Sequence, residues 1–152
     1  MKYQKILVGL DRSEQNSTVF QRALHLAKLD NAQLMIFYCQ PFEEGVDYLS
    51  AVYSEEFTVH TRDLQEKMKH ERERDQDFIN NFAEAARNAG VPTEAEIRRG
   101  DAGRWIRQLA KSWEADLIVV GHRGHRGLAE LFLGSVSNYI LHHAPCSVLV
   151  VQ

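Results

Sequence analysis

Spaced glycines follow the apolar segment Asp116–Val120 of this chain. They stand in Gly121-His-Arg-Gly124-His-Arg-Gly127, and Gly134-Ser135-Val136-Ser137 opens the next predicted helix. Phosphate binding needs several N–H donors that point one way and no Cβ in the path of approach. A glycine-spaced loop and a helix N-terminus supply both, and the hydroxyls of Ser135 and Ser137 can donate to phosphate oxygens. We therefore predict a phosphate site here. The alternative is that these glycines only make turns and cap a helix.

Other motifs for phosphate or catalysis are weaker. The chain has no GxxxxGK[ST] and no GxGxxG after its first predicted strand, so we expect neither a Walker-type loop nor a dinucleotide cofactor. The letters of His122–His125 match the HxGH of nucleotidyltransferases and class I tRNA synthetases, but they follow the fourth strand and not the first. His142 and His143 point about 100° apart on a helix, which disfavours a shared metal. We predict no catalytic residue and no metal ligand.

The elements that position these residues are predicted from hydrophobic periodicity. Continuous apolar runs indicate strands buried on both faces, and amphipathic spacing indicates helices. Residues 41–60 are mixed and stay unassigned, and the charged stretch 66–77 is interpreted as a solvated helix face. The expected strands are Ile6–Leu10, Gln33–Gln40, Thr93–Arg98, Asp116–Val120 and Cys146–Val151, and the expected helices cover 14–30, 61–89, 102–113 and 134–143.

This alternation of strands and helices predicts a single α/β domain over residues 1–152. It is a doubly wound, Rossmann-like arrangement, in which a five-stranded parallel sheet has helices on both faces. In such sheets the ligand lies outside the carboxyl ends of the strands. The candidate positions are therefore Gly9–Asp11, Tyr38–Gln40, Gly100-Asp101 and the segment from Gly121 onward. We expect Asp11-Arg12-Ser13 to form a turn and a helix cap, and Asp101 to cap the next helix.

Composition excludes several classes of protein. The 152 residues are 44% hydrophobic and 26% charged, enough for a core, and the net charge of -3 argues against a dedicated nucleic-acid binder. The cysteines, Cys39 and Cys146, are too few for a disulfide scaffold and are interpreted as buried thiols. No stretch approaches the roughly 18 apolar residues of a membrane span, and the apolar run before Asp11 is too short for a signal peptide. We expect a cytoplasmic protein with no membrane partner.

The glycine pattern also resembles that of a known family. Gly121-x2-Gly124-x9-Gly134-Ser135 matches the nucleotide-binding signature G-x2-G-x9-G-[S/T] of the universal stress proteins. The opening ILVGLDRSE and the ending APCSVLVV resemble the first and last strands of that family, so the likeness runs over residues 3–151. The resemblance implies a sheet of strand order 3-2-1-4-5 and ATP, or related ADP or AMP, as ligand.

Roles for individual residues are also implied by this resemblance. Two positions depart from the family: His122-Arg123 replaces the usual Ser or Thr followed by His, and Tyr38 is bulkier than the common valine. A tyrosine ring turned into the site would shrink the adenine pocket. By the family's pattern, Gly9 and Asp11 lie near adenine and ribose, the backbone of Tyr38 faces adenine, Val120 and Gly121 close that side, and Gly124, Gly134, Ser135 and Val136 contact phosphate.

The function expected from these residues is nucleotide binding in a stress response, in which the bound or empty state alters the dimer surface or the choice of partner. Mg²⁺ is expected on the phosphates of a bound triphosphate. The alternatives are a slow ATPase or adenylyl-transferring enzyme on the same site, and a protein of this fold that has lost its ligand. The strand Cys146–Val151 is expected at an open sheet edge, where it favours a homodimer. Residues 41–75 are expected either to add to that interface or to stay mobile.

Overall fold

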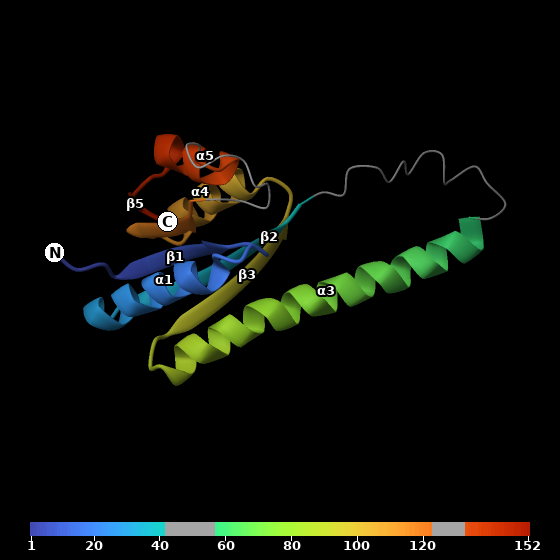
Figure 1. The fold of residues 1–152 in the computed structure, drawn as a ribbon, viewed down its shortest axis with the longest axis horizontal. Helices are drawn as coiled ribbons and strands as arrows, with labels where there is room; N and C mark the ends of the chain where they lie inside the picture. The colour runs from blue at the N-terminus through green and yellow to red at the C-terminus, as the bar shows by residue number, and fades with distance from the viewer. Residues whose placement is uncertain (42–56, 123–132) are drawn as a thin grey trace.

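The fold is an open parallel sheet covered by helices on both faces (Figure 1). It was obtained as a computed structural model, which describes residues 1–41, 57–122 and 133–152, with the backbone alone for 57–61. The five strands are parallel and lie in the order β3-β2-β1-β4-β5, as the resemblance implied. The elements in chain order are β1 (Lys5–Leu10), α1 (Asn16–Asp30), β2 (Gln33–Gln40), α3 (Phe57–Asn88), β3 (Thr93–Arg99), α4 (Ala102–Ser112), β4 (Leu117–Gly121), α5 (Ser135–His143) and β5 (Ser147–Val151).

Strand side chains alternate between the two faces of the sheet, and each face has its own buried core. In β1 and β2 the even-numbered residues, such as Ile6 and Ile36, pack on the face covered by α1 and α3. The odd-numbered residues, such as Leu7 and Phe37, pack on the face covered by α4 and α5. The continuous apolar runs of these strands follow from burial on both faces.

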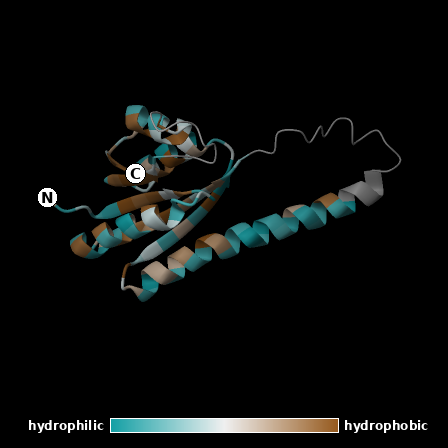
Figure 2. Cartoon of the chain, in the orientation of Figure 1, coloured by the Kyte–Doolittle hydropathy of each residue, from teal (hydrophilic) through white to brown (hydrophobic). Residues whose placement is uncertain are grey.

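Helix α3 is much longer than the strand it covers. Its 32 residues extend about 48 Å, whereas the seven residues of β3 extend about 23 Å. Its C-terminal part packs on the sheet through Phe78, Ile79 and Phe82. Its N-terminal part extends past the end of the sheet, where it is largely hydrophilic (Figures 1 and 2). Most charged side chains of 66–77 are exposed, as expected of a solvated face, but Asp75 is buried.

Helix ends agree in part with the sequence-based expectations. Asp101 caps α4, because its carboxylate accepts a hydrogen bond from the amide of Arg104 at 2.9 Å. Gly90 follows α3 with a φ of +84°, a conformation that glycine adopts without strain. The expected cap of α1 at Asp11–Ser13 is wrong: the N-cap residue is Gln15, and its side chain makes no capping hydrogen bond. None of the described helices has both the length and the apolar character needed to cross a membrane.

Candidate functional site

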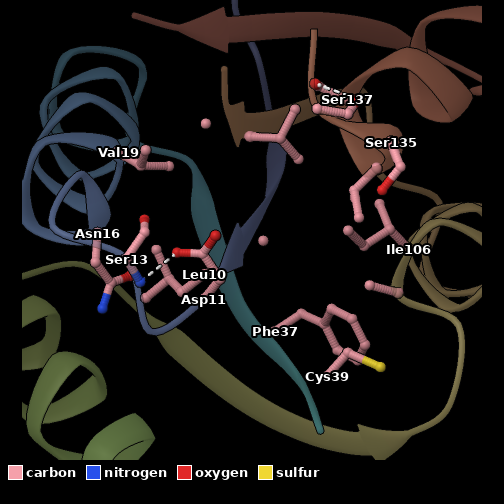
Figure 3. Close-up of a pocket in the computed structure, with 16 residues that line it drawn as sticks. Leu10, Asp11, Ser13, Asn16, Val19, Phe37, Cys39, Ile106, Ser135 and Ser137 are labelled. Atoms are coloured by element: carbon pink, nitrogen blue, oxygen red, sulfur yellow. Dashed lines mark hydrogen bonds between the residues drawn. The ribbon is translucent and has the colours of Figure 1, made fainter. Parts of the chain in front are cut away.

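A cavity opens at the carboxyl ends of β1, β2 and β4, between the start of α1 and the starts of α4 and α5 (Figure 3). The empty space in it is about 650 Å³, a volume that includes the part open to solvent. Five chain segments, which together span more than a hundred residues of the sequence, meet there. The lining residues are Gly9, Leu10, Asp11, Ser13, Asn16, Val19, Phe37, Cys39, Ala102, Ile106, Val120, Gly121, Gly134, Ser135, Val136 and Ser137.

The wall on the α4 side of the cavity is apolar. Phe37, Ile106 and Val120 belong to the core beneath α4 and α5, and all three also line the cavity. Gly9 lies between them on β1: a Cβ added there would stand 2.9 Å from Cδ1 of Ile106 and 3.3 Å from Cγ1 of Val120. Gly9 therefore packs closely against these two side chains, and a Cβ there would require the end of the Ile106 side chain to shift. The wall offers an apolar surface to a flat ring.

Asp11 supplies a carboxylate on the opposite side of the cavity. Its Oδ1 accepts a hydrogen bond from the amide of Ser13 at 2.9 Å, and the Ser13 carbonyl accepts from the amide of Asn16 at 3.3 Å. The carboxylate points toward the cavity in Figure 3. Beside it, Oδ1 of Asn16 is buried and, among the side chains that the structure describes, is the buried polar atom left without a hydrogen-bond partner. This loop therefore holds two acceptors for hydroxyl or amino donors of a ligand.

The N-terminus of α5 closes the third side of the cavity. The amide of Gly134 donates to the carbonyl of His122 at 2.9 Å, so this amide is already engaged within the protein. The buried hydroxyl of Ser137 donates to the carbonyl of Gly134 at 3.0 Å, a different partner from the phosphate expected from the sequence. Within the described residues, the amides of Ser135, Val136 and Ser137 have no acceptor. These amides, the exposed Ser135 hydroxyl and the helix dipole make an electropositive wall.

Tyr38 turns away from the cavity. Its ring packs on the α1 and α3 face, with its centroid 5.3 Å from that of Phe78, while its neighbours in β2, Phe37 and Cys39, line the cavity. Burial raises the pKa of the Tyr38 hydroxyl. The ring therefore does not narrow the pocket, and only the backbone of Tyr38 can serve a ligand there. Strand alternation places Phe37 and Cys39 on one face of β2 and Tyr38 on the other. The sequence alone does not tell which of these faces lines the cavity.

Cys39 contributes a neutral thiol to the apolar wall. The residue is half-buried, and its Sγ donates to the carbonyl of Gly100 at 3.3 Å. Burial raises the pKa of this thiol to about 11, and the charge of Asp101 adds to the effect. The thiolate, which is the nucleophilic form, is therefore scarce at neutral pH. Cys146 is also half-buried with a raised pKa, but it does not line the cavity.

The other candidate residues are placed as follows. Gly9, Asp11, Val120, Gly121, Gly134, Ser135, Val136 and Ser137 meet around the one cavity. Gly124 and the HxGH string beyond His122 lie outside the described residues. His143 donates from Nδ1 to the Tyr139 carbonyl, 2.8 Å away, and stacks on the Tyr139 ring. Across the described part of the chain, no three His, Cys, Asp or Glu side chains gather as metal ligands.

Comparisons with known proteins agree on one family. The family model described as the universal stress protein family matches residues 2–152. The universal stress protein Sll1388 of Synechocystis is 41% identical over 153 residues, which covers 100% of this chain and 99% of that protein. A universal stress protein solved in complex with cAMP matches at 24% identity with a TM-score of 0.66, covering 100% of this chain and 98% of that one. A universal stress protein from Archaeoglobus fulgidus, solved with dAMP, matches at 17% identity with a TM-score of 0.64, and the match covers both chains fully.

Proposed function

Because this chain belongs to the universal stress protein family, we propose that its cavity binds an adenine nucleotide, with ATP as the expected ligand, and that occupancy regulates the protein. The observation that carries the proposal is the open N-terminus of α5. Ser135, Val136 and Ser137 line the same cavity as Asp11, and their amides have no acceptor among the residues that the structure describes. Free amides at a helix N-terminus favour an anion, and a carboxylate across the cavity favours hydroxyl donors. A nucleotide carries both groups.

From the chemistry of the lining residues we propose a place for each part of the nucleotide. The adenine ring lies against Phe37, Ile106 and Val120, and the backbone of Tyr38 reaches its edge. Ribose hydroxyls donate to Asp11 and to the unpaired Oδ1 of Asn16. Phosphate oxygens accept from the amides of Ser135–Ser137 and from the Ser135 hydroxyl. Gly124 adds to the phosphate site by its place in the family's glycine pattern, since it lies outside the described residues.

Two solved relatives support an adenine nucleotide over other phosphates. One was solved in complex with cAMP and the other in complex with dAMP. Both ligands share the adenine base and one phosphate, and differ in the sugar and in the phosphate linkage. A cavity of the same fold with an apolar wall and an anion-binding helix end fits that shared chemistry.

We propose that the protein binds the nucleotide and does not hydrolyse it rapidly. Asp11 is the single carboxylate among the described lining residues, and its Oδ1 is held by the Ser13 amide. A general base for hydrolysis would need to reach an attacking water at the terminal phosphate. Mg²⁺, when present, is held by phosphate oxygens and water, because the described residues offer no acidic cluster for it. The slow ATPase or adenylyl transferase remains the alternative, and turnover well above once per minute that Asp11→Ala abolishes would establish it.

The decisive test is mass spectrometry of the denatured protein for a co-purified adenine nucleotide, together with calorimetric titration of ATP, ADP and AMP. Gly134→Val should abolish binding while the fold survives, since the φ of -57° at Gly134 is open to any residue and only the added side chain obstructs the cavity. Asn138→Val is the matched control, because it places the same side chain on the exposed side of α5. Unchanged ATP affinity in Gly134→Val contradicts the proposed site.

The same proposal includes a homodimer formed through β5. This strand is at one edge of the sheet and pairs only with β4 among the described strands. Val148, Leu149 and Val150 are half-buried in the single chain. An apolar edge strand with unpaired backbone groups favours pairing with a second copy.

A further inference from the structure

Asp75 is buried on a helix whose neighbouring charges are exposed. It is 7% exposed, and with Ser137 it makes up the buried polar residues of the described chain. Its Oδ1 stands 2.6 Å from Nη2 of Arg12, which lies in the turn between β1 and α1. Removing a carboxylate from water is costly unless a partner compensates it. Arg12 is that partner, so the turn and α3 are held to each other by charge.

Two aromatic rings hold the same guanidinium. The Cζ atom of Arg12 is 4.1 Å from the ring centroid of Phe78 and 5.4 Å from that of Tyr38. Phe78 lies three residues after Asp75, so both face the turn from one side of α3. Burial acts to lower the pKa of Arg12, but the hydrogen bond with Asp75 and other interactions outweigh it and raise that pKa. We call Arg12, Asp75, Phe78 and Tyr38 the Arg12 latch.

The latch adjoins the cavity through the peptide bond between Asp11 and Arg12. Asp11 and Ser13 line the cavity, whereas Arg12 between them extends to α3. The Asp11 carboxylate is fixed by the Ser13 amide, and the Ser13 carbonyl by the Asn16 amide. The turn Asp11–Ser13 is therefore held by its own hydrogen bonds beside the cavity and by the Arg12 ion pair on the side of α3.

We propose that Arg12 and Asp75 are positioning residues for the nucleotide site: the latch holds the turn so that Asp11 and Asn16 meet the ribose. This inference rests on the proposed function. If the intact latch favours nucleotide binding, a bound nucleotide must stabilise the latch by the same free energy. The docking of α3 on the turn is then tighter when the cavity is occupied.

The test compares two broken ion pairs. Asp75→Asn removes the charge of the latch, and Glu96→Gln, the control, breaks the Glu96–Arg98 pair on the edge strand β3. We expect Asp75→Asn to weaken ATP binding about tenfold by calorimetry well below the melting temperature, and Glu96→Gln to change it less than about twofold. Asp75→Glu, which keeps the charge, should recover most of the affinity. A general loss of stability would not give this pattern of rescue.

A second measurement needs no nucleotide. The amides of Ser13 and Asn16 should exchange hydrogen faster in Asp75→Asn than in the wild-type protein, and Glu96→Gln should leave them unchanged. If Asp75→Asn does not fold, Arg12→Lys takes its place, because lysine keeps a cation beside the buried Asp75 carboxylate but lacks the planar guanidinium that contacts the two rings. Wild-type affinity for ATP in the folded variant, or unchanged exchange at both amides, overturns the latch. A wild-type protein that binds no adenine nucleotide overturns the proposed function itself, and the exchange measurement distinguishes the two failures.

Discussion

The hydroxyl of Ser137 donates a hydrogen bond to the carbonyl of Gly134, 3.0 Å away, inside the first turn of α5. Ser135, two residues earlier, is exposed at the mouth of the cavity. The two serines of one motif thus have different tasks. Ser137 stabilises the turn that presents the amides, and Ser135 is available to a ligand.

Ser135→Ala should therefore weaken ATP binding about tenfold, the loss of one charge-assisted hydrogen bond of roughly 1–2 kcal/mol. Its melting temperature should stay near that of the wild type. Ser137→Ala is the counterpart: it removes a buried hydroxyl and its hydrogen bond to the Gly134 carbonyl, so thermal stability falls first. Calorimetry and thermal unfolding of both variants check this division, and equal losses of affinity at both positions contradict it.

The two cysteines provide an internal comparison for ligand binding. Iodoacetamide reacts with the thiolate, and the pKa of Cys39 is raised to about 11, so its alkylation rate should rise about tenfold per pH unit up to that pH. At pH 9, ATP should slow alkylation of Cys39, which lines the cavity, and leave Cys146 unaffected. Mass spectrometry of the modified peptides reads both sites in one sample. Protection of both cysteines, or of neither, contradicts the assigned cavity.

The proposed dimer depends on which amides of β5 face outward. The Val151 carbonyl accepts from the His122 amide, so Val151 directs its backbone groups toward β4. Backbone groups alternate along a strand, which places the amide of Leu149 on the same side and that of Val148 on the free edge. Val148→Pro should give a folded monomer, because proline is tolerated where no ladder bond is lost.

Leu149→Pro is the control for that experiment, since it removes a bond to β4 and should destabilise the fold. Light scattering coupled to size exclusion reports the mass of each variant. A wild-type protein that is already monomeric, or a Val148→Pro protein that remains dimeric, excludes β5 as the interface.

Gly9 and Ile106 should show strong coupling in stability. Gly9→Ala brings a Cβ to within 2.9 Å of Cδ1 of Ile106, an overpacking that should cost about 1–3 kcal/mol. Ile106→Val removes that Cδ1 at a cost of about 0.5–1.5 kcal/mol. The double variant should be more stable than the sum of the two losses predicts, as measured by urea unfolding. Additive losses would show that the two positions do not compete for space.

The architecture could be predicted because buried parallel strands have a distinctive pattern. Gln33–Gln40 has the predicted bounds, since the apolar run is continuous and Pro41 ends it. The burial of a charged residue on a helix could not be predicted from the local sequence, because it depends on a partner far away in the chain. Asp75 stands in a stretch that is otherwise exposed, and its burial follows from Arg12, which is 63 residues away in the chain.

The sequence predicted the position of the cavity better than the hydrogen bonds of the residues that line it. The glycine spacing identified the α5 N-terminus, but nothing local reveals that the Gly134 amide is engaged by His122. Likewise, the direction of Tyr38 depends on the pairing of β2 with its neighbours. Both details are properties of the assembled sheet and not of any short segment.

The alternation along β2 gives the chain a sharp sensitivity to insertions. Lengthening the two-residue connection Asn31-Ala32 would be absorbed outside the sheet, but one residue added within Gln33–Phe37 would exchange the faces of every side chain after it. A tyrosine ring would then occupy the space proposed for adenine, and a phenylalanine would meet Arg12. The size of the cavity thus depends on which residues of β2 face it, and so on the even or odd position of each residue along the strand as well as on its identity.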